Sequence, residues 1–294
     1  DSSAQKLRKA AALHFGVEEN QIFLGNGSDD VIALAFMSCF QSNLPILFPD
    51  ITYSFYPVWC DLFRVPYETI ALQEDFTINP EDYHRPNGGI ILPNPNAPTG
   101  IGQTEEALRD ILEHNQNSIV IIDEAYVDFG AYSCVELLKD YENLLIIHTF
   151  SKSRSLAGMR IGIAIGSETI IATLNAVKNS YNSYTVDSLA IEIGTASISD
   201  TAYLKETSAK IIHTREWFSK ELEQLGYLVY PSESNFVFAT HPNVSAKEMF
   251  EALKKEGIFI RYFNLPRIDN HLRITIGTDE QMQLLIKHMK QYLS

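Results

Sequence analysis

The chain has 294 residues, of which 45% are hydrophobic and 20% are charged. This balance is typical of a globular protein, and the length allows one large domain together with a smaller one. The 37 acidic and 23 basic residues give a net charge of −14, which argues against non-specific binding to nucleic acid or to an anionic membrane surface. No apolar run approaches the roughly 20 residues that a membrane-spanning helix needs.

The three cysteines, Cys39, Cys60 and Cys134, are widely spaced and form no Cys-x-x-Cys pair. Such a sparse, odd-numbered set fits a reducing compartment, so we expect a cytoplasmic protein. The eight histidines show no metal-like spacing, and we expect no metal site. Asp1 leads directly into a helical pattern, and we expect that a preceding segment is absent from this sequence.

In chain order, the first turn of interest is Gly25–Asp30, which separates an expected strand at 22–24 from an expected helix at 31–40. Its two glycines allow close backbone approach, and Ser28 and Asp29 suit a helix N-terminus, whose free amides can bind an anion. A capped helix without any ligand explains this segment equally well.

The following pattern predicts alternating strands and helices up to about residue 175. We therefore predict a doubly wound, mostly parallel α/β sheet in a large domain, residues 1–185. Residues 186–294 are predicted to form linking helices and a smaller α+β domain. The expected helices are 3–15, a helix following 52–56, 104–115, 135–139, 186–199, 203–225, 245–256 and 279–292; the expected strands are 45–49, 65–72, 89–92, 118–122, 144–147, 161–166, 227–230, 235–239, 258–261 and 272–276.

Polar residues, or prolines with their restricted backbone, follow several of the expected strands. Residues 93–100 read Pro-Asn-Pro-Asn-Ala-Pro-Thr-Gly, and Asp123 ends a run of β-branched residues. Open α/β sheets bind ligands in the crevice at the carboxyl ends of their strands. Asp123 is either part of such a site or a solvated acid at the end of the strand. Tyr53 is either a packing residue or an aromatic platform for a flat ring.

Lys152 lies in a loop of small and hydroxyl residues between the apolar runs 144–147 and 161–166. Burial and the nearby Arg160 both disfavour an ammonium ion, and a neutral amine is the nucleophile that forms Schiff bases with aldehydes. Thr149, Ser151 and Arg160 together suit a phosphate group. The alternative is a structural lysine that bonds a backbone carbonyl.

The order of these features resembles that of fold type I pyridoxal-phosphate enzymes in the aminotransferase class I/II superfamily. The resemblance covers essentially the whole chain, as far as Leu272–Gly277, and is closest in character to the histidinol-phosphate aminotransferase family. It implies a transaminase of histidine biosynthesis that uses pyridoxal 5′-phosphate to exchange an amino group between histidinol phosphate or imidazole acetol phosphate and glutamate or 2-oxoglutarate.

The resemblance also implies roles for individual residues. Lys152 corresponds to the lysine that binds the cofactor, Asp123 to the partner of the ring nitrogen, Tyr126 to the partner of the phenolic oxygen and Tyr53 to the stacking residue. The residues expected around the phosphate are Ser28, Asp29, Thr149, Ser151 and Arg160.

This chain departs from the family pattern at Ala97, where a second asparagine is common. Asn96 is the expected replacement for its contact with the cofactor. The family further implies a homodimer, in which an N-terminal segment reaches the active site of the neighbouring subunit.

Two arginines, Arg261 and Arg273, follow or lie in apolar strands of the small domain, where a charge is costly unless it meets an anion. Arg273 corresponds to the family arginine for the substrate carboxylate, and we expect both arginines to help bind a phosphate. Local ion pairs with Asp269 or Glu256 are the alternative. The functions that remain open are an aromatic or general aminotransferase, a threonine-phosphate decarboxylase and a non-catalytic regulator.

Overall fold

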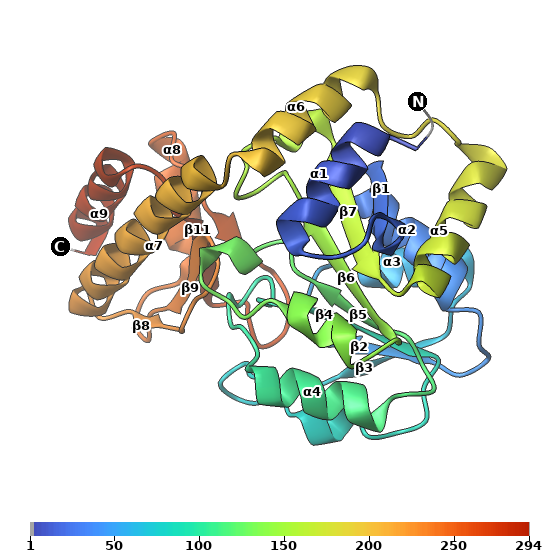
Figure 1. Ribbon diagram of the computed structural model, residues 1–294. Coiled ribbons are helices and arrows are strands. Elements are labelled where there is room, and N and C mark those ends of the chain that lie inside the picture. The colour runs from blue at the N-terminus through green and yellow to red at the C-terminus, as the bar shows by residue number, and fades with distance from the viewer. Residues whose placement is uncertain (1–2, 294) are drawn as a thin grey trace.

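Two β-sheets, each packed with helices, make up the computed structural model, which describes residues 3–293 (Figure 1). The first two thirds of the chain form the larger sheet and its helices, and the last third forms the smaller sheet. Within the described residues, no helix combines the length and the apolar character needed to span a membrane.

The larger sheet has seven strands in the order β1-β7-β6-β5-β4-β2-β3. The pairs from β3 through β2, β4 and β5 to β6 are parallel, and β7 runs antiparallel to both β6 and β1. The prediction of a mostly parallel sheet is therefore confirmed. Its strands are β1 (Ile22–Asn26), β2 (Ile46–Pro49), β3 (Tyr67–Ile70), β4 (Gly89–Pro93), β5 (Val120–Asp123), β6 (Leu144–Thr149) and β7 (Ile161–Gly166).

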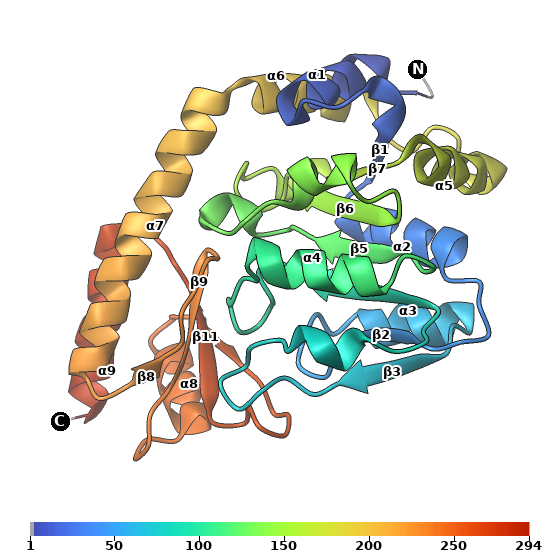
Figure 2. The ribbon, with the colours of Figure 1, turned by 60° about the horizontal axis from the view of Figure 1, so that its bottom comes forward.

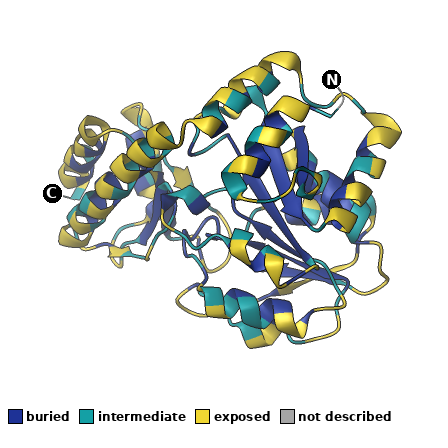
Figure 3. Cartoon of the chain, viewed as in Figure 1, coloured by how far each residue is buried: buried dark blue, intermediate teal, exposed yellow. Residues whose placement is uncertain are grey.

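Helices cover both faces of this sheet, because the central strands are apolar on both sides. In β4, Ile90 and Leu92 contribute to the core on one face, whereas Ile91 contributes to the core on the other. Figure 3 shows the buried strands between helices whose outer surfaces are exposed. One face is packed by α1 (Gln5–Phe15), α4 (Glu105–His114) and α6 (Ser188–Ser199), and the other by α2 (Ser28–Cys39), α3 (Tyr56–Phe63) and α5 (Glu168–Tyr181).

The smaller sheet is antiparallel, with the strand order β10-β11-β9-β8. The long helix α7 begins beside α6 and extends to this sheet, where it packs against β8, β9 and α9 (Figure 2). The α+β character predicted for the end of the chain is confirmed. The elements are α7 (Thr201–Gln224), β8 (Leu228–Val229), β9 (Phe236–Thr240), α8 (Ala246–Lys255), β10 (Arg261–Tyr262), β11 (His271–Thr275) and α9 (Asp279–Leu293).

Some local expectations differ from the structure. The strand expected at 258–261 begins only at Arg261, because the Ile258 N–H still bonds the Leu253 carbonyl at the end of α8 (3.0 Å). The helix expected at 135–139 is a 3₁₀ helix, and α5 was not predicted as a separate element. The 3₁₀ helices are η1 (Glu19–Gln21), η2 (Pro80–Tyr83), η3 (Val127–Phe129), η4 (Cys134–Lys139) and η5 (Ala157–Met159).

Helix α6 packs against α1, although it follows residue 185 in the chain. Its buried residues Ala190 and Ile198 belong to the same core cluster as Leu7 of α1. The boundary between the two domains at residue 185 therefore stays a proposal, and α6 packs with the large sheet although it follows that boundary in the chain.

The parallel strands bring their carboxyl ends to one edge of the large sheet. Pro93 at the end of β4 is paired with Asp123 at the end of β5, and Asp123 is paired with Ile147 near the end of β6. Side chains that follow these strands therefore lie close together, as expected for a ligand site in an open α/β sheet.

Candidate active site

Asp123 is a buried carboxylate at the end of β5, with 6% of its surface exposed. Its two oxygens accept hydrogen bonds from the Tyr56 hydroxyl (3.0 Å) and the Ala125 backbone N–H (3.2 Å). Burial raises the pKa of Asp123 to about 6, and these two hydrogen bonds limit the rise. No cationic side chain among residues 3–293 forms an ion pair with it, so Asp123 is suited to a positively charged ligand group.

The N-terminus of α2 meets the β6–β7 connection at one end of the site. The Arg160 guanidinium lies 3.5 Å from the Asp29 carboxylate and packs over Gly27, whose φ is 89°. A Cβ atom on Gly27 would lie 2.4 Å from that guanidinium, so only glycine permits this approach. Because the first amides of a helix lack intrahelical partners, this end of the site suits a phosphate.

Two hydroxyl side chains from the end of β6 face the same region. Thr149 donates a hydrogen bond from Oγ1 to Ser151 Oγ (3.0 Å), and the Ser151 backbone N–H donates to Thr149 Oγ1 (3.2 Å). Together with the amides of α2 and the guanidinium of Arg160, they form a polar cup whose donors match a phosphate.

Lys152 extends from the same connection toward the ring of Tyr126. Its Nζ atom lies 5.2 Å from the ring centroid, and both side chains are only partly buried. Tyr126 in turn packs edge-on against Phe236 of the smaller sheet, with the ring centroids 5.2 Å apart. The amine thus lies between the polar cup and the smaller sheet.

Tyr53 also belongs to this site, and its hydroxyl donates a hydrogen bond to Asp29 Oδ1 (3.0 Å). Burial and the neighbouring Asp29 carboxylate raise the pKa of this hydroxyl, so it remains protonated and able to donate. Its ring also packs with Phe55, Tyr56 and Trp59. The packing and stacking interpretations are therefore compatible, since Tyr53 also lines the first cavity.

A cavity of about 310 Å³ joins these groups. It opens beside a second cavity of about 640 Å³, and the two share Tyr53, Ala97 and Arg273. Of the residues predicted from the sequence, the following line the first cavity: Ser28, Asp29, Tyr53, Asp123, Tyr126, Thr149, Ser151, Lys152, Arg160 and Arg273.

Arg261 lines the second cavity and lies directly opposite Arg273 in the antiparallel pair of β10 and β11. Like charges at such positions repel each other. Neither arginine forms an ion pair within residues 3–293, so the proposed local pairs with Asp269 or Glu256 are absent there. Burial, and secondarily Arg261, lower the pKa of Arg273, and its Nε is buried without a hydrogen-bond partner. Two unpaired guanidinium groups side by side suit an anion.

Asn96 is not among the residues that line these two cavities, so its expected contact with the cofactor stays a prediction. Its Oδ1 accepts from Thr52 (3.0 Å), while its Nδ2 donates to the Ile51 carbonyl (2.9 Å) and to Thr99 Oγ1 (3.1 Å). Both Nδ2 protons are thereby used, and the side chain stabilises its own loop. Ala97 lies at the surface of the first cavity instead.

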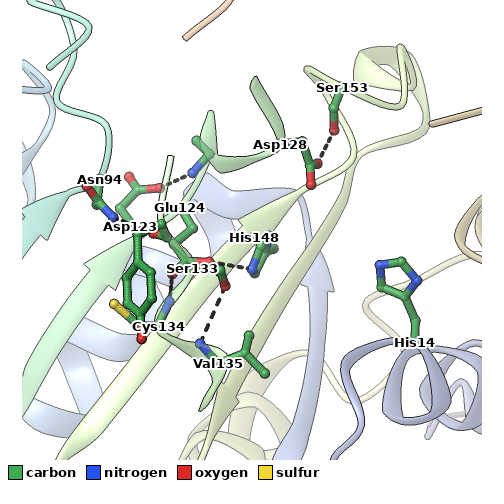
Figure 4. Close-up of polar contacts among 12 residues, drawn as sticks. His14, Asn94, Asp123, Glu124, Asp128, Ser133, Cys134, Val135, His148 and Ser153 are labelled. Atoms are coloured by element: carbon green, nitrogen blue, oxygen red, sulfur yellow. Dashed lines mark hydrogen bonds and ion pairs between the residues drawn. The ribbon is translucent and has the colours of Figure 1, made fainter. Parts of the chain in front are cut away.

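The sequence reasoning missed a buried acid–imidazole pair behind the site. Glu124 Oε2 lies 2.9 Å from His148 Nε2 and accepts a hydrogen bond from Ser133 (2.8 Å), as Figure 4 shows. Burial lowers the pKa of His148, but Glu124 outweighs this effect and leaves it above its usual value. Since Glu124 follows Asp123 and His148 precedes Thr149, the pair joins the two strand ends that carry the site. The position of each residue next to a predicted site residue at a strand end was a signal that could have identified the pair.

The structure also brings His84, Asp110 and His114 together on the surface, which the sequence spacing did not predict. His84 Nε2 lies 2.7 Å from Asp110 Oδ2, and His114 Nδ1 lies 2.9 Å from the Asp110 carbonyl oxygen. The nitrogens that face Asp110 are thus already used in hydrogen bonds, and the two rings are stacked. This arrangement is explained without a metal ion.

The fold and this site are those of the class of pyridoxal-phosphate-dependent enzymes, and comparison with known proteins gives the family. Residues 1–289 match the family described as aminotransferase class I and II. The chain belongs to this family.

Among its relatives, a histidinol-phosphate aminotransferase of Lactococcus lactis subsp. cremoris is 50% identical over 292 residues, which are 99% of this chain and 82% of that protein. A histidinol-phosphate aminotransferase of Clostridium beijerinckii is 50% identical over 294 residues, covering 100% of this chain and 82% of that protein. The crystal structure of the Clostridium acetobutylicum histidinol-phosphate aminotransferase superimposes with a TM-score of 0.92 at 25% identity, covering 100% of this chain and 90% of that one.

Proposed function

We propose that the chain is a pyridoxal-phosphate-dependent aminotransferase that exchanges an amino group between histidinol phosphate and 2-oxoglutarate in histidine biosynthesis. The observation that carries this proposal is one cavity in which an unpaired buried carboxylate, a lysine amine and a polar cup for phosphate face each other. Relatives that are 50% identical to this chain are named histidinol-phosphate aminotransferases, which supports the proposal.

The residues of the first cavity fit the cofactor. Asp123 would accept a charge-assisted hydrogen bond from the protonated ring nitrogen, and Tyr53 would pack on the ring face. The α2 amides, with Thr149, Ser151 and Arg160, would hold the phosphate. When bound, the cofactor supplies an electron sink for the carbanion of the substrate.

Lys152 is proposed to act twice. The Lys152 amine would first bind the aldehyde group of the cofactor covalently, with loss of water. After the substrate amine has displaced it, the free lysine amine would carry a proton from the substrate carbon. Tyr126, whose ring lies under Nζ, would hold the amine in place and donate to the phenolic oxygen of the cofactor.

The second cavity has the chemistry of the proposed substrate. Apolar side chains, among them Phe48, Pro57 and Leu265, line it together with Arg261 and Arg273. An imidazole ring would contact the apolar wall, and a phosphate would meet the paired guanidinium groups. The amino donor has carboxylates and no phosphate, so Arg273, which borders both cavities, is proposed to bind its carboxylate.

Replacement of each arginine with alanine should separate the two substrates. Arg261→Ala is expected to lower kcat/KM for histidinol phosphate by about ten- to a hundredfold, the loss of one charge-assisted contact, and to affect glutamate much less. Arg273→Ala is expected to impair both substrates. Steady-state kinetics with each substrate provides the measurement. Equal losses for both substrates in Arg261→Ala would contradict phosphate recognition and leave a general aminotransferase.

We further propose that the enzyme is a cytoplasmic homodimer with active sites completed by both subunits. Large apolar side chains remain exposed on and beside α3: Val58 is 48% exposed, Leu62 67% and Phe55 48%. This patch begins two residues from Tyr53, and such a patch suits a protein partner. Sedimentation velocity is expected to give a dimer. A monomer with full activity would rule out composite sites.

The threonine-phosphate decarboxylase alternative is not favoured, because the half-identical relatives are aminotransferases. An assay of the holoenzyme with glutamate and a panel of keto acids and phosphorylated substrates tests the proposed reaction. Amino transfer to imidazole acetol phosphate is the expected outcome. Release of carbon dioxide from a phosphorylated amino acid, without amino transfer, would overturn the proposal.

A further inference from the structure

The segment 263–270, which connects β10 to β11, forms one wall of the second cavity. It contributes Phe263, Leu265, Pro266, Arg267 and Ile268. The facing wall comes from the end of β2, the connection 50–54, the start of α3 and β3. The cavity therefore keeps this wall only while the segment of the smaller sheet lies against the larger one. Arg261 and Arg273 flank the segment on its two strands.

Arg267, within this segment, forms a three-point contact with the large sheet. Its Nη1 donates to Asp50 Oδ2 (2.8 Å), and its Nη2 donates to the carbonyl oxygens of Leu72 (2.7 Å) and Gln73 (2.9 Å). Asp50 follows β2, and its other oxygen accepts from the Leu72 N–H (2.9 Å). One guanidinium thus joins the ends of two large-sheet strands to the connection of the smaller sheet.

Neighbouring contacts strengthen this attachment. The guanidinium carbon lies 5.7 Å from the ring centroid of Phe76, and the adjacent Ile268, with 1% of its surface exposed, packs into the core of the large sheet. Arg267 itself has a φ of 69°, a left-handed conformation that is unfavourable for a residue with a side chain. A conformation of this kind persists when surrounding contacts fix it.

The charge of Arg267 differs from the charges of the other two arginines at this cavity. Asp50 neutralises it, and both terminal nitrogens already donate to protein oxygens. Arg261 and Arg273 have no such partners within the described residues. Arg267 is thus arranged to hold the segment, while its neighbours are arranged to meet an anion.

We propose that Arg267 is a positioning residue that clamps segment 263–270 against the large sheet and so keeps the substrate cavity closed and Arg261 and Arg273 in register with the cofactor site. The proposal rests on the proposed aminotransferase function for its kinetic consequences. The clamp itself depends only on the contacts of Arg267 and Asp50.

The first test compares Arg267→Ala and Asp50→Asn in the holoenzyme. Both are expected to raise KM about ten- to a hundredfold for histidinol phosphate and for glutamate alike, with kcat and the absorbance of the bound cofactor little changed. The double variant is expected to be no worse than Arg267→Ala, because removing the guanidinium already breaks its contact with Asp50. Arg85→Ala, which breaks the exposed ion pair with Glu68 on the large sheet, is the matched control and should behave as wild type.

Direct anion binding by Arg267 makes the opposite prediction. Asp50→Asn would then free the guanidinium and lower KM for histidinol phosphate, and Arg267→Ala would impair that substrate alone. Either result, or unchanged KM values in Arg267→Ala, would overturn the positioning role.

Amide hydrogen exchange separates this proposal from the proposed reaction, since it needs no substrate. In Arg267→Ala and Asp50→Asn, exchange in 263–270 is expected to be at least about tenfold faster than in wild type, with the region around Asp123 unchanged. Unchanged exchange in 263–270 would refute the clamp. If wild type fails to transaminate histidinol phosphate while the exchange result holds, the proposed function is wrong and the clamp stands.

Discussion

Replacing Lys152 with alanine is expected to reduce transamination by about four orders of magnitude or more, because in the proposed function one amine both attaches the cofactor and moves the substrate proton. Lys152 is the one lysine among the described residues that line the first cavity, so no neighbouring amine can replace it. Borohydride reduction followed by mass spectrometry should find the cofactor covalently attached in wild type and absent in Lys152→Ala.

A matched control is available in Lys139→Ala, since Lys139 is exposed and forms an ion pair with Glu136 away from the site. This variant should retain full activity. A small primary amine in solution is expected to restore part of the proton transfer in Lys152→Ala, whereas it would not repair a misfolded protein. Normal turnover by Lys152→Ala would show that the assignment is wrong.

The large sheet was predictable because its strands are short runs of apolar residues separated by helical patterns. Runs such as Leu144–Ile147 and Ile161–Gly166 are buried on both faces, and that composition distinguishes strands covered on both faces from exposed ones. Helix α5 was harder to recognise, because its apolar residues form a weak pattern among polar ones. The late start of β10 depended on a single hydrogen bond at the end of α8, and the sequence contains no clear mark of it.

The candidate site was largely predictable for a related reason. Asp123, Thr149 and Lys152 each lie at or just after the carboxyl end of a parallel strand, and parallel strands bring these ends together. The direction of the Asn96 side chain could not be predicted from its position in the loop. A side chain in a tight loop turns toward whatever partners its backbone offers, and here those partners are Thr52, Ile51 and Thr99.

The features that the sequence did not reveal are long-range polar pairs. Tyr56 contacts Asp123 across 67 positions, and Arg267 contacts Asp50 across 217. Neither pair has a periodicity or a motif, since each depends on how separate elements are packed. Only the three-dimensional arrangement gives these side chains their partners.

Asp123→Asn is expected to retain the cofactor but to lower kcat by about 10²–10³-fold. A neutral amide cannot keep the ring nitrogen protonated, and the developing negative charge then loses the electrostatic stabilisation that the ion pair provides. Pre-steady-state measurement of proton abstraction should locate the loss in that step. Asp140→Asn, which alters an exposed acid paired with Arg109, is the control and should keep full activity.

The pH dependence of cofactor binding tests the same assignment without turnover. In the cofactor-free protein, Asp123 has a pKa of about 6, raised by burial. As the pH falls through 6, the carboxylate gains a proton and loses its attraction for the cationic ring nitrogen, so the affinity of wild type should fall. The phosphate of the cofactor titrates in both proteins, so the difference between wild type and Asp123→Asn isolates the carboxylate. Identical pH profiles for the two proteins, or an unchanged kcat, would show that Asp123 does not face the ring nitrogen.

Tyr56→Phe should give an intermediate result, because it leaves the carboxylate in place and removes one of its two hydrogen bonds. The Tyr56 bond lowers the pKa of Asp123, so its loss should move the pH dependence of cofactor affinity upward. At neutral pH a larger fraction of Asp123 would then be protonated, and kcat is expected to fall by about tenfold. The titration would be assigned to Asp123 by two results together: the pH dependence of cofactor affinity shifts upward in Tyr56→Phe, and the titration near pH 6 is absent in Asp123→Asn. A downward shift would mean that the hydroxyl stabilises the protonated acid instead.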